Sequence, residues 1–436
     1  MSAFVPTVPC DVRGNLLTCR SRAAPQRARS AATSRSSACV VTMSDIKGSS
    51  DKPYKIAVLP GDGAGPVVTD AAVKVLKAVS KYTDIKFEFT EGLYGEKALE
   101  QTGSLVPEDT IALCRGSDAV LRGYQGKSRF TPEHAQGNLS AHTILKEKLG
   151  LFVQLRPVKV FDPLVSSSPI REDLVRGTDI MIVREVSGGA LPYTDTSLVN
   201  AEEAKSQFSY TRQQVSNIAD VALEIAERRS GRVLNVDKAD SMNVSRFWRT
   251  ALHEEFKKKL GSDRRDILLE DMFVDDFCRE LVLHPARFDL IVTSNLFGDI
   301  LSEVASGISG GMRLSPSAWL SGSGPGVYGP ADLFNLSAYP RGSQEMPVEG
   351  KIFSNPIASI RAASMMLRYS LEEPAAADLI QIALTRVLKE VIPADAPKSI
   401  KYIRKVSCDE FADEMADAFE LLRNTDLMCD PEVCGE

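Results

Sequence analysis

Histidine is scarce in this chain of 436 residues, which has only four (His134, His142, His253 and His284). A site built on histidine, whether a Ser-His-Asp triad or a His-rich metal centre, is therefore not expected. The eight cysteines form no C-x-x-C pair and no zinc-binding spacing, so buried or idle thiols are the default interpretation. Cys429 and Cys434 are close enough in sequence to suggest a redox-sensitive pair.

Long apolar runs and an excess of positive charge are also missing. No stretch approaches the roughly 18 apolar residues that a membrane span needs, so no membrane partner is expected. The formal net charge is -6, which gives no reason to expect nucleic acid as a partner. The hydrophobic fraction of 43% and the charged fraction of 25% are typical of a soluble globular protein. The length favours two domains plus a tail.

Residues 1–42 differ in composition from the rest of the chain. They contain six arginines and a single acid, Asp11, in a background rich in serine and alanine. Basic, acid-poor segments of this kind are typical of disordered transit peptides for organelles. The serine and alanine content predicts import into the plastid (chloroplast stroma), with the mitochondrial matrix as the alternative. A plain disordered tail is the simpler interpretation.

Apolar segments that alternate between strand and helix patterns predict an α/β fold with a largely parallel core. An apolar run begins at Lys55, and after a glycine-rich loop residues 67–79 have helical spacing. Further strands are predicted at 118–123, 149–158, 179–185, 232–237 and 288–295, and further helices at 211–229, 245–260, 357–370 and 374–391. Residues 309–350 are rich in Gly, Ser and Pro, so irregular loops are expected there.

The glycine-rich loop at residues 61–66 reads Gly-Asp-Gly-Ala-Gly-Pro. It matches neither G-x-G-x-x-G, because Pro66 occupies the sixth position, nor the P-loop pattern. A glycine-rich loop before a helix can bring backbone N–H groups close to an anion. A tight structural turn explains the loop equally well.

Two acids four residues apart, Asp299 and Glu303, give the strongest carboxylate signal. On a helix this spacing places both side chains on one face, about 6 Å apart at Cβ. A hard divalent ion such as Mg²⁺ or Mn²⁺ would neutralise the pair. A solvated acidic face is the alternative, although the apolar neighbours Ile300 and Leu301 argue against a fully solvated helix. Asp275 is a candidate third ligand.

Basic side chains complement these acids. Arg156 and Arg184 each stand at the end of an apolar segment, and Lys146 precedes Arg156 by ten residues. Arginine binds carboxylates in a bidentate manner, so two convergent arginines would suit a di- or tricarboxylic acid. For any single one of these residues a surface ion pair is an ordinary explanation. Lys238 directly follows the predicted strand 232–237 and is a candidate general base if it is partly desolvated.

Five stretches in a fixed order give the chain a family resemblance. They are LPGDGAGP, LGLFVQLRPVK, IVREVSGG, VDKAD followed by FWR, and PARFDLIVTSNLFGDILSE. From about Lys55 to about Val391 the chain resembles the isocitrate/isopropylmalate family of β-decarboxylating dehydrogenases, in particular its 3-isopropylmalate branch. The resemblance implies a mixed sheet flanked by helices that is not a Rossmann fold. It implies a first domain at residues 50–151 and 310–425, on the cofactor side, and a dimerising second domain at 152–309, on the metal and substrate side.

The resemblance also implies a reaction. A 2-hydroxy acid such as 3-isopropylmalate, an intermediate of leucine biosynthesis, is oxidised by NAD or NADP and loses its β-carboxylate with the help of Mg²⁺ or Mn²⁺. By position, the metal ligands are Asp299, Glu303 and a partner subunit's Asp275. Substrate carboxylates are held by Lys146, Arg156 and Arg184. The proton-transfer base is the partner subunit's Lys238. Ser140 matches a serine of isocitrate-specific members, which keeps an isocitrate-type substrate open.

The sequence departs from the family pattern at several positions. The family's catalytic tyrosine is Leu191 here, with Tyr193 two positions away as a candidate replacement. Lys146 replaces an arginine, Glu303 an aspartate and Asp240 an asparagine. The cofactor loop His-Gly-Ser-Ala-Pro-Asp is replaced by residues 329–351. The remaining cofactor-binding candidates are Gly61, Asp62, Gly63, Asp240 and Asn355.

These departures leave two functions open. The first is a divergent dehydrogenase, assembled as a homodimer, whose 326–351 loop binds the cofactor through other contacts. The second is a binding or regulatory subunit that keeps the fold without the chemistry and pairs with an active paralogue.

Overall fold

The computed structural model describes residues 48–50, 52–125, 140–190, 207–260, 266–331, 355–394 and 403–423. All of them belong to one compact unit, Val40–Glu436. Several sequence-based predictions lie outside the described residues: the transit segment 1–42, Tyr193, the loop from residue 332 to 351, and Cys429 and Cys434. Within the described residues no helix is both long and apolar enough to span a membrane.

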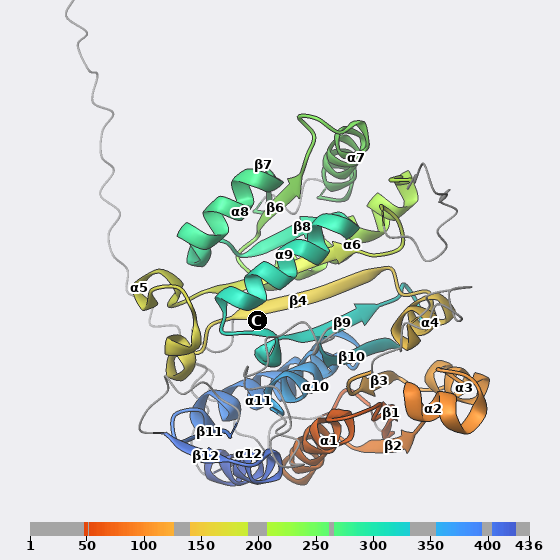
Figure 1. The fold of residues 1–436 in the computed structure, drawn as a ribbon, viewed down its shortest axis with the longest axis vertical. Coiled ribbons are helices and arrows are strands. Elements are labelled where there is room, and N and C mark those ends of the chain that lie inside the picture. Colours follow the sequence, from red (N-terminus) through yellow and green to blue (C-terminus); the bar gives the residue numbers. More distant parts are fainter. Residues whose placement is uncertain are drawn as a thin grey trace, which may run out of the picture. The chain divides into compact units, whose positions relative to one another are not determined.

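A ten-stranded mixed sheet runs through the unit (Figure 1), in the order β2-β1-β3-β10-β9-β4-β5-β8-β6-β7. Its strands are β1 (Tyr54–Leu59), β2 (Phe87–Glu91), β3 (Ala119–Arg122), β4 (Val153–Lys159), β5 (Asp179–Glu185), β6 (Arg232–Asp237), β7 (Leu268–Phe273), β8 (Leu290–Thr293), β9 (Pro316–Leu320) and β10 (Gly326–Pro330). A separate parallel pair is formed by β11 (Val391–Pro393) and β12 (Arg404–Val406). The mixed sheet flanked by helices is the predicted fold class.

The strands are parallel at both ends of the sheet and antiparallel at its centre. β9 is antiparallel to both β10 and β4, and β4 is antiparallel to β5. The prediction of irregular loops at 309–350 is therefore wrong for its described part, because β9 and β10 lie in the middle of the sheet. The 326–351 loop likewise begins as strand β10. Both strands are short, and the Pro and Ser of β9 and the Gly and Pro of β10 hide the apolar alternation that usually marks a strand.

The other predicted elements are confirmed to within a few residues at their ends. The helices are α1 (Gly65–Tyr82), α2 (Glu96–Thr102), α3 (Glu108–Arg115), α4 (Ala141–Leu149), α5 (Glu172–Val175), α6 (Arg212–Arg228), α7 (Asn243–Leu260), α8 (Val274–Leu283), α9 (Asn295–Ile308), α10 (Ile357–Tyr369), α11 (Pro374–Val387) and α12 (Cys408–Arg423). The start of α6 shows why such ends are readable in a sequence. Thr211 and Gln214 form a capping box, in which each side chain bonds the backbone N–H of the other.

The predicted domain boundary falls between two neighbouring strands of the sheet. The strands from residues 50–151 and 310–425 are β2, β1, β3, β10 and β9, and those from 152–309 are β4, β5, β8, β6 and β7. The boundary would therefore fall between β9 and β4, which are hydrogen-bonded neighbours. The division into two domains remains a prediction.

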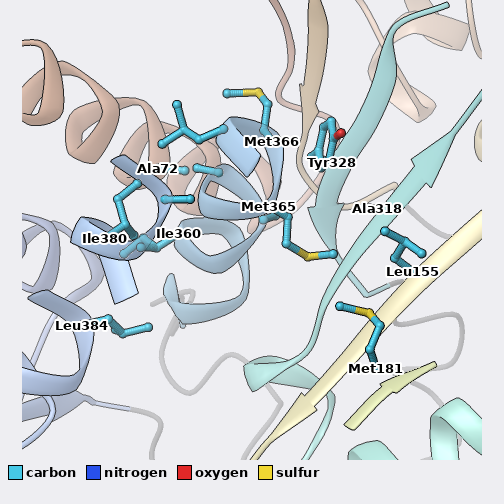
Figure 2. Close-up of a cluster of buried hydrophobic side chains, with 14 of the residues drawn as sticks. Ala72, Leu155, Met181, Ala318, Tyr328, Ile360, Met365, Met366, Ile380 and Leu384 are labelled. Atoms are coloured by element: carbon cyan, nitrogen blue, oxygen red, sulfur yellow. The ribbon is translucent and has the colours of Figure 1, made fainter. Parts of the chain in front are cut away.

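The largest part of the core surrounds helix α10, which is buried over nearly its whole length. Figure 2 shows labelled side chains of α1, α10 and α11 gathered with those of β4, β5, β9 and β10. Met365 of α10 lies on the side that faces Leu155 and Met181 of the sheet. Helix α10 thus joins the helical layer to strands from both predicted domains.

Met366→Ala is expected to lower the free energy of unfolding by about 2–5 kcal/mol, because a fully buried methionine leaves a cavity when truncated. Met366 is 0% exposed within the cluster around α10. Leu421→Ala on α12 is the matched control, since Leu421 is 54% exposed and its loss should change stability by no more than about 0.5 kcal/mol. Urea unfolding followed by circular dichroism measures both. Equal shifts for the two variants would contradict the packing described for α10.

Candidate functional site

Two arginines of the sheet meet two acids of helix α9. Arg184 Nη1 donates to Asp299 Oδ1, and Arg156 Nη2 donates to Glu303 Oε1 over 3.0 Å. The arginine side chains are 8% and 6% exposed, whereas those of Asp299 and Glu303 are 50% and 44% exposed. Each pair therefore joins a guanidinium in the wall of the site to a carboxylate that water and ligands can still reach.

Strand register explains why the two arginines share a face of the sheet. Gln154 of β4 lies opposite Arg184 of β5, and Arg156 lies opposite Ile182. Side chains two residues apart on a strand point the same way, and cross-strand partners share a face. Gln154 and Arg156 therefore lie on the same face of the sheet as Arg184. On α9 the four-residue spacing places both acids on the side that meets these arginines.

Arg184 is held by more partners than the sequence suggested. Asn295 Oδ1 accepts from its Nε over 3.1 Å and from its Nη2 over 2.7 Å, and Gln154 Oε1 accepts from its Nη1 over 3.1 Å. At Gly298 an added Cβ would lie 2.6 Å from Cγ of Arg184, so only glycine lets this side chain pass along α9. Burial lowers the pKa of Arg184, with Asp299 opposing the shift, yet an arginine stays charged at neutral pH.

Asn295, Gln154 and Gly298 were missed as site residues by sequence reasoning. The sequence held a signal for two of them. Asn295 precedes Asp299 by one helical turn, and Gly298 directly precedes Asp299. No sequence pattern marks Gln154, because its role depends on the β4–β5 register.

Lys238 forms a second cluster with Asp240 and Asp275. Its Nζ donates to Asp275 Oδ1 over 2.8 Å and to Asp240 Oδ2 over 3.0 Å. These bonds, that to Asp275 first, raise the pKa of Lys238, and the lysine lowers the pKa of both acids. The Lys238 side chain is 25% exposed, but within one chain its bonds to the two acids outweigh desolvation and keep it in its charged form.

The three metal-ligand candidates do not meet within one chain. Asp275 pairs with Lys238, while Asp299 and Glu303 pair with arginines. Among the described residues no group of three or more His, Cys, Asp or Glu side chains could hold a metal ion. Asp299 and Glu303 alone offer two accessible oxygen donors on one helix face. That donor chemistry fits Mg²⁺ or Mn²⁺, which retain several water ligands.

Helix α4 carries Ser140, His142 and Lys146. The Ser140 hydroxyl caps the helix by accepting from the backbone N–H of Thr143 over 3.1 Å, so this predicted substrate contact has a structural role. The ammonium of Lys146 lies 4.8 Å from the centroid of the Trp319 ring. His142 packs on the same indole, with 4.2 Å between ring centroids.

The glycine-rich loop before α1 is packed against the chain itself. The N–H of Asp62 donates to the carbonyl of Tyr124, and that of Gly65 donates to the carbonyl of Asp62. The Asp62 carboxylate accepts from the backbone N–H groups of Glu96 and Lys97 at the start of α2. The N–H groups of Asp62 and Gly65 are thus occupied within the chain, which is consistent with a structural turn. Binding of a cofactor by Gly61, Asp62 and Gly63 remains a prediction.

Gly61→Ala is expected to destabilise the protein more than Gly63→Ala. Both glycines have positive φ, +74° and +57°, which costs a non-glycine residue about 1–2 kcal/mol. At Gly61 an added Cβ would also lie 2.0 Å from the carbonyl oxygen of Tyr124, whereas at Gly63 it meets nothing within 4 Å. Thermal unfolding of the two variants isolates the steric term. Equal losses would contradict the close packing of the loop.

The other cofactor-binding candidates also have local partners. Asp240 accepts from Lys238, and Asn355 Oδ1 accepts from the backbone N–H of Ile357 over 3.0 Å at the start of α10. The candidate catalytic residue Tyr193 lies outside the described residues.

The chain is similar to a large group of known proteins. Residues 55–415 match the family model "Isocitrate/isopropylmalate dehydrogenase". A 3-isopropylmalate dehydrogenase of Geobacillus kaustophilus is 40% identical over 371 residues, which cover 84% of this chain and 95% of the relative. The corresponding protein of Synechococcus elongatus is 38% identical over 348 residues, covering 78% and 90%.

Solved structures agree with these sequence matches. Isocitrate dehydrogenase from Methylococcus capsulatus superposes with a TM-score of 0.68 and 26% identity, covering 85% of this chain and 100% of that one. A β-decarboxylating dehydrogenase from Thermococcus kodakarensis, in its apo form, gives 0.66 and 26%, covering 86% and 98%.

Proposed function

This chain belongs to the isocitrate/isopropylmalate dehydrogenase family, and from that premise we propose that it oxidises and decarboxylates a 2-hydroxy acid of the 3-isopropylmalate type with NAD or NADP and a divalent metal ion. That it is a β-decarboxylating dehydrogenase follows from the family and from the names of its relatives. The observation that carries the proposal is the pairing of Arg156 and Arg184 with Glu303 and Asp299 at one face of the sheet.

The two arginine–acid pairs suit a substrate with two carboxylates. Each guanidinium is nearly buried and needs an anion beside it. A substrate carboxylate can take the place of each acid, because arginine binds carboxylates in a planar, bidentate manner. Asp299 and Glu303 are then available as oxygen ligands of Mg²⁺ or Mn²⁺. A metal held by these two carboxylates would supply positive charge to stabilise negative charge that develops on the substrate.

The chain's own residues position the substrate and hold a proton. Gln154 and Asn295 fix the plane of the Arg184 guanidinium, which sets the direction from which a carboxylate can approach. Lys238 carries a proton at Nζ, held there by Asp275 and Asp240, so it can return a proton to the product once the β-carboxylate has left.

We propose that the site is completed in a homodimer. Lys238 and Asp275 pair with one another and not with the acids of α9, so the partner subunit's Lys238 and Asp275 would supply the missing groups. Helices α8 and α9 pack together and expose four large apolar side chains: Val282, Leu283, Ile300 and Val304. An apolar face of this kind on a protein surface is typical of an interface.

Two titrations test the proposed reaction. The purified protein is titrated with NAD and with NADP in the presence of Mg²⁺, and nucleotide fluorescence reports binding. Addition of 3-isopropylmalate should then produce the absorbance of reduced cofactor. Binding of neither nucleotide would eliminate the dehydrogenase and favour the regulatory subunit. Loss of turnover on chelation of the metal, and its return with Mg²⁺ or Mn²⁺, would support the metal requirement.

A further inference from the structure

Lys238 stands on a short turn between β6 and α7, and this turn is fixed by bonds within the chain. The carbonyl of Lys238 accepts from the N–H of Ser241 over 3.2 Å and from that of Met242 over 2.9 Å. Asp237, the last residue of β6, is 1% exposed, and its Oδ1 accepts from the N–H of Ala239 over 2.9 Å. The backbone on both sides of Lys238 is therefore held in place.

The carboxylate of Asp237 is held in turn by Arg249 of α7. Arg249 Nε donates to Asp237 Oδ2 over 2.8 Å, and Arg249 Nη2 donates to Asp237 Oδ1 over 2.6 Å. This is the bidentate geometry in which arginine binds a carboxylate most strongly. Asn235 Nδ2 donates to the same Oδ2 over 2.7 Å. Because a buried carboxylate is costly without a positive charge beside it, Asp237 can keep this position only if Arg249 neutralises it.

A second arginine of α7 holds the turn by its carbonyl groups. Arg246 Nε donates to the carbonyl of Ala239 over 2.8 Å, and Arg246 Nη2 donates to the carbonyl of Asp240 over 2.7 Å. Arg246 and Arg249 are three residues apart on α7, so their side chains are neighbours on one face of the helix. Together they hold the turn on both sides of Lys238.

Strand register connects the same turn to Asp275. Asp237 of β6 lies opposite Phe273 of β7, so Lys238 and Asp275 follow the ends of neighbouring strands, where they bond over 2.8 Å. The Phe273 ring lies beside both basic groups, with its centroid 5.1 Å from Cζ of Arg249 and 5.6 Å from Nζ of Lys238. These distances allow cation–π attraction to both. The position of the Lys238 ammonium therefore depends on Arg249 and on the residues that Arg249 contacts.

We propose that Arg246 and Arg249 are positioning residues for proton transfer, and that they act by holding the turn that places the Lys238 ammonium at the substrate. The inference rests on the proposed function, in which Lys238 Nζ gives its proton to the carbon that has lost the β-carboxylate. A proton donor must lie within hydrogen-bond reach of the atom that accepts the proton. A displacement of about 1 Å can slow a reaction about 10²-fold. Binding of the substrate carboxylates by Arg156 and Arg184 does not depend on this turn.

Kinetics of arginine variants test the positioning role. Arg249→Met is expected to lower kcat for 3-isopropylmalate about 10²-fold, and Arg246→Met is expected to lower it by less. Arg249→Lys keeps the charge without the bidentate bond, so its kcat should lie between those of the wild type and Arg249→Met. The KM for 3-isopropylmalate should stay within about threefold of the wild-type value. Measurements in H₂O and D₂O should show a larger solvent isotope effect on kcat, because the slowed proton transfer then limits the rate.

Control variants separate this role from a purely structural one. Arg212→Met removes an exposed arginine that pairs with Glu254 of α7, and it should leave kcat unchanged. If Arg249→Met does not fold, because it leaves Asp237 buried and unpaired, two other variants provide the test. Arg249→Lys keeps a positive charge beside Asp237, and Arg246 is exposed, so both variants should fold.

Two results would overturn the positioning role while leaving the proposed function intact. The first is a wild-type kcat in the folded variants. The second is a lowered kcat with an unchanged solvent isotope effect, because a loss of folded sites lowers kcat in this way without slowing proton transfer. Failure of the wild type to oxidise any 2-hydroxy acid would instead remove the proposed function, and the positioning role with it.

Discussion

Arg184→Met is expected to lower kcat/KM for the 2-hydroxy acid by about 10³-fold, since loss of a charged donor that binds a substrate carboxylate costs about 2–5 kcal/mol of binding free energy. The buried Arg184 side chain is the guanidinium fixed by three separate acceptors: Asp299, Asn295 and Gln154. Methionine preserves much of the volume of the stem and removes every donor. Steady-state kinetics with a series of substrate concentrations would separate the loss in KM from the loss in kcat.

Arg184→Lys is the matched control for this variant. It keeps the positive charge but cannot donate from both sides of a planar group, so its kcat/KM is expected to lie between those of the wild type and Arg184→Met. The same series at Arg156, for which the described part of the chain supplies one acceptor, Glu303, should follow the same order with smaller losses. A kcat/KM for Arg184→Met within about threefold of the wild type would leave no role for Arg184 in holding substrate, because a loss that small is under 1 kcal/mol.

Local sequence signals are sufficient for part of the fold and for the charged members of the site. The sequence predicts strands at 179–185 and 232–237, which are the bounds of β5 and β6, because runs of apolar, β-branched residues between turns favour buried strands. The i, i+4 spacing is likewise enough to predict that Asp299 and Glu303 share one helix face.

The partners of these residues could not be predicted, because they depend on register and on strand order. Arg184 meets Gln154 only because β4 runs antiparallel to β5 in a particular register. Strands β9 and β10 were missed because their small residues and prolines, which suit close packing in the sheet, look like loop residues in the sequence. Gly329 of β10 packs where an added Cβ would lie 2.5 Å from the carbonyl oxygen of Arg122, so its glycine serves close strand packing while its sequence resembles a loop.

Mixing two inactive variants is expected to restore about a quarter of wild-type activity. Lys238→Met and Arg184→Met each remove a group that the proposed reaction needs. If the partner subunit's Lys238 serves the site that contains Arg184, a heterodimer of the two variants contains one intact site and one doubly damaged site. Random reassociation makes about half of the dimers heterodimers, as expected for a symmetric two-fold assembly. Half of the dimers with half of their sites intact gives the quarter.

If activity is not restored on mixing, Lys238 does not serve the partner subunit's site. If Lys238 acted on the Arg184 of its own chain, every site in the mixture would lack one group, and activity would stay at the level of the separate variants. What favours sharing is the state of Lys238 within one chain, where it is bonded to Asp275 and Asp240 and not to any acid of α9. Because Lys238 is paired with Asp275 and Asp240, it can approach a substrate beside Arg184 only together with these two acids. We expect a second subunit, bound through the exposed apolar face of α8 and α9, to bring all three groups to that substrate.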